Sequence, residues 1–115
     1  MIPVRALAIS GMLLGAGLLS GGGLATAGSE KSHATHGVII EGMRYTPSKL
    51  RVVSGDWVVF SNKDLFPHTV TADGKSFDSQ GIAADTSWKF KAARPGVYSY
   101  HCIFHPMMKG TITVR

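Results

Sequence analysis

The sequence predicts an all-β fold, a sandwich or barrel of seven or eight short strands. Three observations lead to this fold class. After Gly37 the chain runs through short segments rich in β-branched and aromatic residues, turn residues separate these segments, and helical periodicity is absent from them. A chain of 115 residues holds one such domain and is too short for a two-domain catalytic cleft.

The first three expected strands lie between residues 38 and 61. Residues 38–40 are all β-branched, and residues 50–53 form a short apolar segment with one charge. Residues 57–61 are almost continuously apolar, which is typical of a central strand. The turn signals that end these strands lie at 41–42, 54–56 and 62–64, with a further bend at 46–48.

The later strands follow the same rule. Residues 68–72 and 97–102 are rich in β-branched and aromatic side chains, and residues 76–79 form a weak strand. Residues 86–91 alternate apolar and polar positions, which predicts one buried and one wet face. Residues 111–114 close the chain. The turns that separate these strands lie at 73–74 and 95–96.

One face of each strand is expected to enter a common core. No repeat or linker interrupts the pattern, so residues 37–115 are expected to form a single domain. The expected core residues are Val38, Ile40, Leu50, Val52, Trp57, Val59, Trp88, Phe90, Tyr98, Tyr100, Ile112 and Val114.

Residues 1–27 have the pattern of a secretory signal peptide. They contain one Arg, an apolar run at 6–19, and small residues ending in Ala-Thr-Ala. The apolar run is short of the roughly 20 residues that a membrane span needs, so a retained anchor is the less favoured alternative. We expect cleavage after Ala27, export of the protein, and no stable membrane association afterwards.

Residues 28–36 are polar and small, and they are expected to be a flexible lead-in. They contain His33 and His36, a spacing that binds metal ions adventitiously, but the favoured interpretation is a solvated tail. Without Arg5, 11 basic residues against 7 acidic ones leave a charge of +4. These charges are scattered, so nucleic-acid binding is not expected.

The single cysteine lies in a run of metal-binding side chains. Cys102, His105 and a methionine, Met107 or Met108, follow one another closely. Thiolate and thioether are soft ligands that suit copper, and imidazole binds copper in both oxidation states. His68 supplies the further nitrogen that completes a trigonal His₂Cys plane with a weak axial methionine. The pattern predicts one type 1 copper ion, and thiolate ligation would also protect a lone thiol after export.

These segments resemble those of the cupredoxins, the type 1 blue copper proteins. The closest likeness is to the amicyanins, with the plastocyanins and pseudoazurins more distant. The likeness rests on residues 66–70, 98–108 and 109–114, and it covers the chain from about Val38 to Arg115. It implies a Greek-key β-sandwich and a periplasmic protein that carries single electrons by Cu(II)/Cu(I) cycling. It assigns the copper ligands to His68, Cys102, His105 and an axial Met108.

One position departs from the family pattern. Plastocyanins and amicyanins commonly carry Asn directly after the first histidine ligand, where it holds the ligand loop, and this chain has Thr69. A hydroxyl can still bond to the loop backbone, although it offers fewer hydrogen bonds than an amide. The departure bears on the stiffness of the loop and the tuning of the potential, and copper binding is still expected.

Six residues near the expected ligands are candidates for docking a partner. The apolar members are expected to form a collar around the exposed edge of His105, with two lysines beside it, and the alternatives are simple loop packing and solvation. The resemblance implies transient redox partners, a dehydrogenase or a c-type cytochrome or both, and a monomeric carrier. The six are Phe66, Pro67, Pro106, Met107, Lys63 and Lys109.

Two other functions fit this sequence less well. A periplasmic copper chaperone or storage protein would use the same donors, and a Met-rich or His-rich extension would favour it, but His33 and His36 are too few. An enzyme is not expected, because four ligands leave no open position for substrate.

Overall fold

The computed structural model describes residues 32–115, and all regular structure within them is β. The expected signal peptide, and the part of the lead-in before residue 32, lie outside the described residues. In the described part, no helix is long and apolar enough to span a bilayer. The expected all-β sandwich is confirmed.

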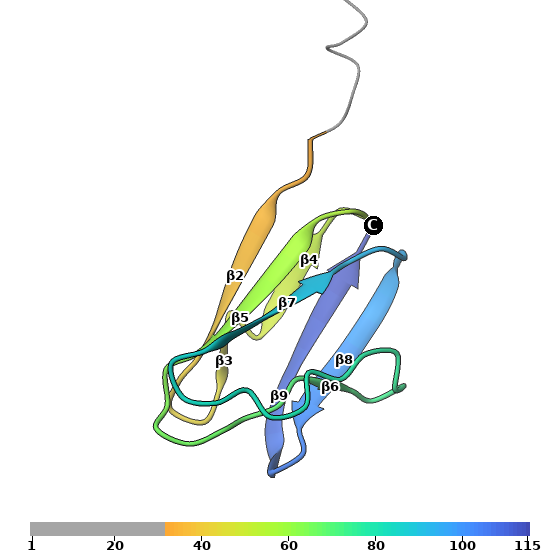
Figure 1. Ribbon diagram of the computed structural model, residues 1–115. Coiled ribbons are helices and arrows are strands. Elements are labelled where there is room, and N and C mark those ends of the chain that lie inside the picture. The colour runs from red at the N-terminus through yellow and green to blue at the C-terminus, as the bar shows by residue number, and fades with distance from the viewer. Residues whose placement is uncertain (1–31) are drawn as a thin grey trace, which may run out of the picture. The chain divides into compact units, whose positions relative to one another are not determined.

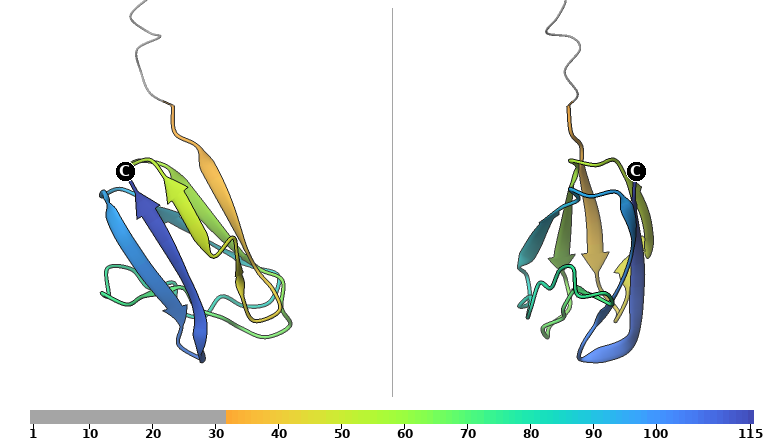
Figure 2. Two further views of the ribbon diagram at one scale, coloured as in Figure 1. Left: turned by 180° about the vertical axis from the view of Figure 1, so that it is seen from behind. Right: turned by 90° about the vertical axis from the view of Figure 1, so that its right-hand side faces the viewer.

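Two four-stranded sheets form the sandwich, and they are seen as two layers in the right-hand view of Figure 2. The first sheet has the order β3-β2-β5-β7 and the second the order β4-β9-β8-β6 (Figure 1). One pair in each sheet is parallel, β2 with β5 and β4 with β9, and the other pairs are antiparallel. The strands are β2 (Thr35–Ile40), β3 (Tyr45–Thr46), β4 (Lys49–Val52), β5 (Trp57–Asn62), β6 (Thr71–Ala72), β7 (Ser87–Lys91), β8 (Gly96–Cys102) and β9 (His105–Val114).

The core lies between the two sheets and takes alternate residues of each strand. Of the expected core residues, Leu50, Trp88, Phe90 and Tyr98 are only partly buried, but they pack against the central cluster. The described residues that form this cluster are Val38, Ile40, Tyr45, Val52, Val58, Phe60, Val70, Ile82, Ala92, Tyr100, Cys102, Met108, Ile112 and Val114.

The inward face of β5 differs from the expected one. Val58 and Phe60 are fully buried, whereas the expected core residues Trp57 and Val59 lie on the half-exposed outer face. A continuous apolar run carries no alternation, so its sequence does not indicate which face is buried. The outer face of Trp57 is covered by a lysine, with Lys89 Nζ 4.7 Å from the ring centroid.

The last strand is much longer than expected. β9 begins at His105 rather than at residue 111, and only Ile103 and Phe104 separate it from β8. The segment expected to be a ligand loop is therefore mostly a tight hairpin. The sequence did not indicate this part of the strand because it contains Pro106. Proline is a weak strand former, and its missing N–H bars it from most ladder positions.

Three smaller differences concern strand ends. β2 begins at Thr35, so the end of the expected flexible lead-in belongs to the first sheet. Asp78 makes only an isolated bridge, to Thr71, where a weak strand was expected. His68 likewise makes an isolated bridge, to Ile82, before β6 begins. Residues 33–115 form one compact unit.

Candidate metal centre

Three metal-binding side chains meet at one end of the sandwich. Donor atoms of His68, Cys102 and His105 all lie within 4.8 Å of one another. His68 precedes β6, Cys102 ends β8 and His105 opens β9. The first two are fully buried and His105 is half-buried. The structure therefore brings together three of the four residues expected to bind copper, from segments 34 residues apart in sequence.

The β8–β9 hairpin sets two of these positions. Cys102 and His105 are register partners across the hairpin, and the ladder is irregular between His101 and Cys102. An irregular ladder re-aims side chains at the end of a strand. Cys102 continues the inward face of β8 after Tyr100, whereas His101 lies on the half-exposed face and bonds to Asp73 at 2.7 Å. His101 therefore lies on the opposite face of β8 from Cys102.

The fourth expected ligand, Met108, lies on the inward face of β9. It is 4 % exposed, whereas Met107 is 91 % exposed. Along β9 the buried positions alternate from Met108 to Val114, so Met108 shares the interior side with the cysteine and Met107 faces solvent. The geometry supports Met108 as the axial donor.

Backbone and amide hydrogen bonds fix the segment that carries His68. His68 and Ile82 exchange two backbone hydrogen bonds of 3.2 and 2.7 Å. The buried amide of Asn62 donates to the carbonyls of Phe66 and Ile82, each at 2.9 Å, and its oxygen accepts from the N–H of Asp64 at 2.9 Å. Asn62 thus holds the turn before His68 from inside the protein.

Asp64 bonds directly to the histidine ligand. Its carboxylate accepts from His68 Nε2 at 2.7 Å, and also from the N–H groups of Gly42 at 2.8 Å and Met43 at 3.2 Å. Burial opposes ionisation, but the hydrogen bonds from Gly42, His68 and Met43 outweigh it and lower the pKa of Asp64. A carboxylate that accepts from Nε2 places the proton of neutral His68 there, which leaves Nδ1 free to bind a metal.

One nitrogen of each imidazole is left available to a metal ion. His105 Nδ1 is buried, and no hydrogen-bond partner for it is found among the described residues. His68 Nδ1 has only the sulfur of Cys102 beside it, at 3.7 Å. Buried polar atoms rarely lack partners, so His105 Nδ1 fits a bound ion, and His68 Nδ1 faces the same ion position beside the thiol. Two imidazole nitrogens, a thiol and a nearby thioether form the donor set of a type 1 copper site.

Thr69 connects the two sides of the centre. Its N–H donates to Cys102 Sγ at 3.3 Å, and its hydroxyl accepts from the N–H of Ile103 at 3.0 Å. The expectation that this hydroxyl bonds to the ligand-loop backbone is confirmed. Because Thr69 follows His68 and Ile103 follows Cys102, this hydrogen bond joins the two segments that carry these ligands.

Two tyrosines line the interior side of the centre. Tyr45 and Tyr100 meet edge to face with centroids 4.8 Å apart, and Tyr45 donates its hydroxyl to the Thr69 carbonyl. Burial, and then the neighbouring Cys102 thiol, raise the pKa of Tyr45. Tyr100 lies over Gly110 on the facing strand, where any side chain would overlap its ring. Tyr45 thus bonds to the residue that follows His68, and Tyr100 packs against Tyr45 in the core.

Apolar side chains surround the exposed edge of the centre. Phe66, Pro67, Phe104 and His105 line a shallow hollow of about 330 Å³. Phe66 packs on both histidines, with centroids 5.2 Å from His68 and 6.1 Å from His105. The expected collar residues Pro106 and Met107, and the expected lysines Lys63 and Lys109, are all exposed. Leu65, Ile103 and Phe104 are also exposed here and were not expected.

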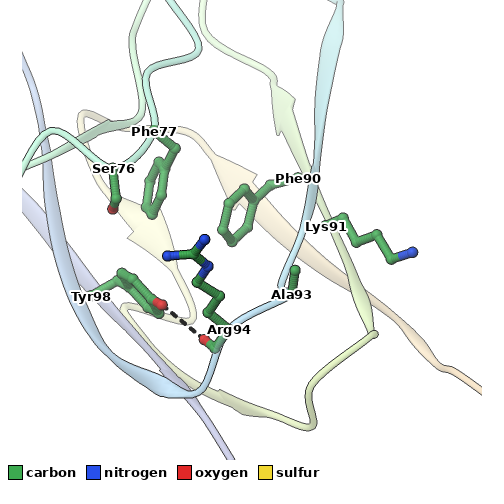
Figure 3. Close-up of a pocket in the computed structure, with 7 residues that line it drawn as sticks. All are labelled: Ser76, Phe77, Phe90, Lys91, Ala93, Arg94 and Tyr98. Carbon is green, nitrogen blue, oxygen red and sulfur yellow. Dashed lines mark hydrogen bonds between the residues drawn. The ribbon is translucent and has the colours of Figure 1, made fainter.

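A second hollow of about 250 Å³ lies between the open edges of the sheets (Figure 3). Its aromatic rings pack together, and Tyr98 donates its hydroxyl to the Arg94 carbonyl at 2.8 Å. It contains no histidine, cysteine or carboxylate. Its lining residues are Ser76, Phe77, Phe90, Lys91, Ala93, Arg94 and Tyr98.

Sequence reasoning missed Asn62, Asp64 and Tyr45. Residues 62–64 were interpreted only as a turn, although an acid four residues before a candidate histidine ligand was an available signal. The hydrogen bonds of Asn62 to Ile82, and of Tyr45 to Thr69, span 20 and 24 residues. No local pattern indicates such partners.

Comparisons with known proteins agree with this geometry. The family model for a cupredoxin-like domain matches residues 13–114. Amicyanin-alpha of Methylorubrum extorquens is 31% identical over 107 residues, which cover 89% of this chain and 85% of the relative. Plastocyanin of Ulva pertusa is 31% identical over 64% of this chain and 88% of its own.

Solved structures give the same result. A reduced mutant of amicyanin superimposes with a TM-score of 0.66 at 28% identity, covering 77% of this chain and 89% of the other. A purple cupredoxin from Nitrosopumilus maritimus gives a TM-score of 0.63 at 28% identity, covering 70% and 99%. Sequence and structure thus lead to the same group of proteins.

Proposed function

The chain belongs to the cupredoxin-like family, and on that premise we propose that it is a periplasmic type 1 copper protein that carries single electrons between redox partners. The observation that carries the proposal is the donor set. His105 Nδ1, which has no protein partner, and His68 Nδ1, whose partner is the Cys102 sulfur, lie together at the only thiol of the chain, with Met108 on the same interior side. Copper bound there supplies one-electron chemistry by cycling between Cu(II) and Cu(I).

The protein's own contribution is to hold these donors still. Asp64 fixes the orientation and tautomer of His68, and Asn62 holds the turn that carries them. Thr69 donates to the sulfur and ties down the following turn. A site fixed before the ion binds changes little between oxidation states, which is what a carrier needs. We assign the metal ligands to His68, Cys102, His105 and Met108.

These features favour a carrier over a copper chaperone or storage protein. Delivery of copper to a partner requires donors that separate easily, whereas His68 and Cys102 are fully buried and held by several hydrogen bonds. The four donors also fill the coordination of the ion, which leaves no position for a substrate.

The collar around His105 is the proposed docking surface. The edge of His105 opens into the hollow with Phe66, Pro67 and Phe104, and Met107 stands almost fully exposed nearby. An exposed apolar patch of this kind suits brief contact with a partner. Lys63 and Lys109 are the charges proposed to attract an acidic redox partner, a dehydrogenase or a c-type cytochrome. The leader pattern of residues 1–27 supports export to the periplasm.

Voltammetry and electron self-exchange of the copper-loaded protein test the proposal. We expect a reversible one-electron couple and rapid self-exchange, since two copies can meet collar to collar. Met107→Lys places a charge on the collar and should slow self-exchange at least tenfold. Val97→Lys is the matched control, because Val97 is 70 % exposed on the outer face of β8 and should change nothing.

Two results would contradict the proposal. An irreversible couple, with copper lost on reduction and passed readily to a chelator, would favour the chaperone. If Met107→Lys and Val97→Lys slowed self-exchange equally, electron transfer would not pass through the collar.

A further inference from the structure

The hydroxyl of Thr69 is the first member of a chain of hydrogen bonds that leads to the surface. Ile103 N–H donates to Thr69 Oγ1 at 3.0 Å, and Thr69 Oγ1 lies 2.9 Å from Thr71 Oγ1. Thr71 Oγ1 in turn lies 3.1 Å from Asp78 Oδ1. The side chains of Thr69 and Thr71 thus connect the turn after Cys102 to the exposed carboxylate of Asp78.

The chemistry of the last member fixes the direction of the whole chain. An ionised carboxylate only accepts hydrogen bonds, so Thr71 must donate its single hydroxyl hydrogen to Asp78. Thr71 then has only lone pairs to offer Thr69, so Thr69 must donate to Thr71. The lone pairs of Thr69 are thereby left for the N–H of Ile103.

We propose that Thr71 and Asp78 are positioning residues of the copper centre, which keep Thr69 as an acceptor for Ile103 and so fix the ligand turn against the His68 segment. This inference rests on the proposed copper function. It also accounts for how a threonine serves where related proteins commonly carry an amide. The amide brings several hydrogen-bonding atoms of its own, whereas the hydroxyl needs Thr71 and Asp78 to orient it.

The carboxylate end of the chain is itself held in place. Asp78 Oδ1 also accepts from Gln80 N–H at 2.8 Å, and Asp78 forms a bridge with Thr71. The hydroxyl of Ser79 accepts from Val70 N–H and donates to the Gln80 carbonyl, both at 2.7 Å. The turn at 78–80 is thus locked onto residues 70–71, so the acceptor for Thr71 has a defined position.

Amide hydrogen exchange at Ile103 in the copper-free protein tests the inference directly. Thr71→Val removes the second hydroxyl and keeps the branched shape. We expect Ile103 to exchange about fivefold faster, the change that corresponds to one net hydrogen bond. Thr71→Ser restores a hydroxyl and should restore slow exchange. Thr113→Val is the matched control, because Thr113 is a half-exposed strand threonine whose hydroxyl has no hydrogen bond among the described residues.

The same variants are then loaded with copper, and the visible band and midpoint potential are measured. We expect Thr71→Val to shift both, and Thr71→Ser and Thr113→Val to leave both at the wild-type values. Asp78→Ala changes an exposed side chain, so it reports on the chain of hydrogen bonds even if Thr71→Val fails to fold. It should give a smaller increase in exchange at Ile103.

Two results would overturn the inference. Unchanged exchange at Ile103 in both Thr71→Val and Asp78→Ala would show that the hydroxyls do not orient Thr69. If exchange at Ile103 became faster while the visible band and the midpoint potential stayed at the wild-type values, these hydrogen bonds would stabilise the fold without positioning the copper ligands. A wild-type protein without a blue band would refute the proposed function instead, and exchange at Ile103 would still decide whether Thr71 and Asp78 position the turn.

Discussion

Two of the aspartate–histidine pairs among the described residues are built alike. Asp56 accepts from His36 Nε2 at 2.9 Å and from the N–H groups of Ala34 and Val53, each at 3.0 Å. Asp64 likewise accepts from His68 Nε2 and from two backbone N–H groups. In both cases one carboxylate connects a histidine to distant backbone, and in both the pKa of the aspartate is lowered.

The two pairs differ in the surroundings of Nδ1, the histidine nitrogen that does not bond to the carboxylate. The side chain of His36 is 28% exposed, whereas His68 is fully buried with its Nδ1 beside Cys102 Sγ. The first pair holds the start of β2 against the β4–β5 turn, and the second prepares a metal ligand. A hydrogen bond to a carboxylate therefore orients the histidine ring in both pairs. The third group beside the ring, here the Cys102 thiol, decides whether the histidine can serve a metal centre.

The largest expected effect comes from removing that third group. Cys102→Ala should abolish the blue colour and tight Cu(II) binding, because the chain has no other thiol. The Asp64–His68 pair would then resemble the Asp56–His36 pair, a structural contact only. Titration with Cu(II) followed by visible absorption measures the effect. A variant that kept the band near its wild-type intensity would refute the role of Cys102.

The aspartates themselves give the sharpest paired test. Asp64→Asn should weaken Cu(II) binding about 10- to 100-fold and raise the midpoint potential, because His68 loses a charged partner that increases its basicity. Asp56→Asn should lower the urea midpoint and leave the potential unchanged. Competition titration, voltammetry and urea unfolding of both variants measure this. If both variants shifted the potential equally, the distinction between the pairs would be lost.

A smaller effect should separate the two adjacent methionines. Met108→Leu should keep the colour and raise the midpoint potential, because the weak axial bond that favours Cu(II) is removed. Met107→Leu should leave both nearly unchanged, since that side chain is 91 % exposed. Voltammetry of the two variants decides between them, and exchanged roles would show that Met107 is the axial ligand.

The smallest expected effect is on acid stability at the Asp56 pair. Hydrogen bonds from His36, Ala34 and Val53 lower the pKa of Asp56 from 3.8 to about 2. A lowered pKa means that the ionised group stabilises the fold above about pH 4, and that this stability is lost as the pH falls toward 2. The urea midpoint of the copper-free protein should therefore fall less between pH 5 and pH 2.5 in Asp56→Asn than in wild type. Parallel declines would contradict the assignment.

The sequence predicted the strands best where apolar and polar residues alternate. The alternation at 86–91 matches β7, and the β-rich run at 97–102 matches β8 almost to the residue. The continuous apolar run at 57–61 gave a strand but not its buried face, because period-two information was missing. The start of β9 was missed since its first residues owe their strand structure to pairing across the hairpin with β8.

The candidate centre was predictable as far as donor chemistry allowed. The spacing of Cys102 and His105, with an upstream histidine and a methionine at 107 or 108, indicated the metal and the donor types, and the family resemblance assigned Met108. Asp64 was open to prediction, because it lies four residues before His68, whereas the bonds of Asn62 to Ile82 and of Gly42 to Asp64 span 20 and 22 residues and have no local signal. His36 shows the same limit, since nothing in the lead-in indicated its bond to Asp56.

We propose that the donors His68, Cys102, His105 and Met108 hold one type 1 copper ion. The most direct measurement is titration of the copper-free protein with Cu(II), followed by visible absorption and electron paramagnetic resonance. We expect an intense blue band that saturates at one copper per chain and disappears on one-electron reduction. A colourless or weakly coloured complex, or a band that needs more than one copper to saturate, would contradict it.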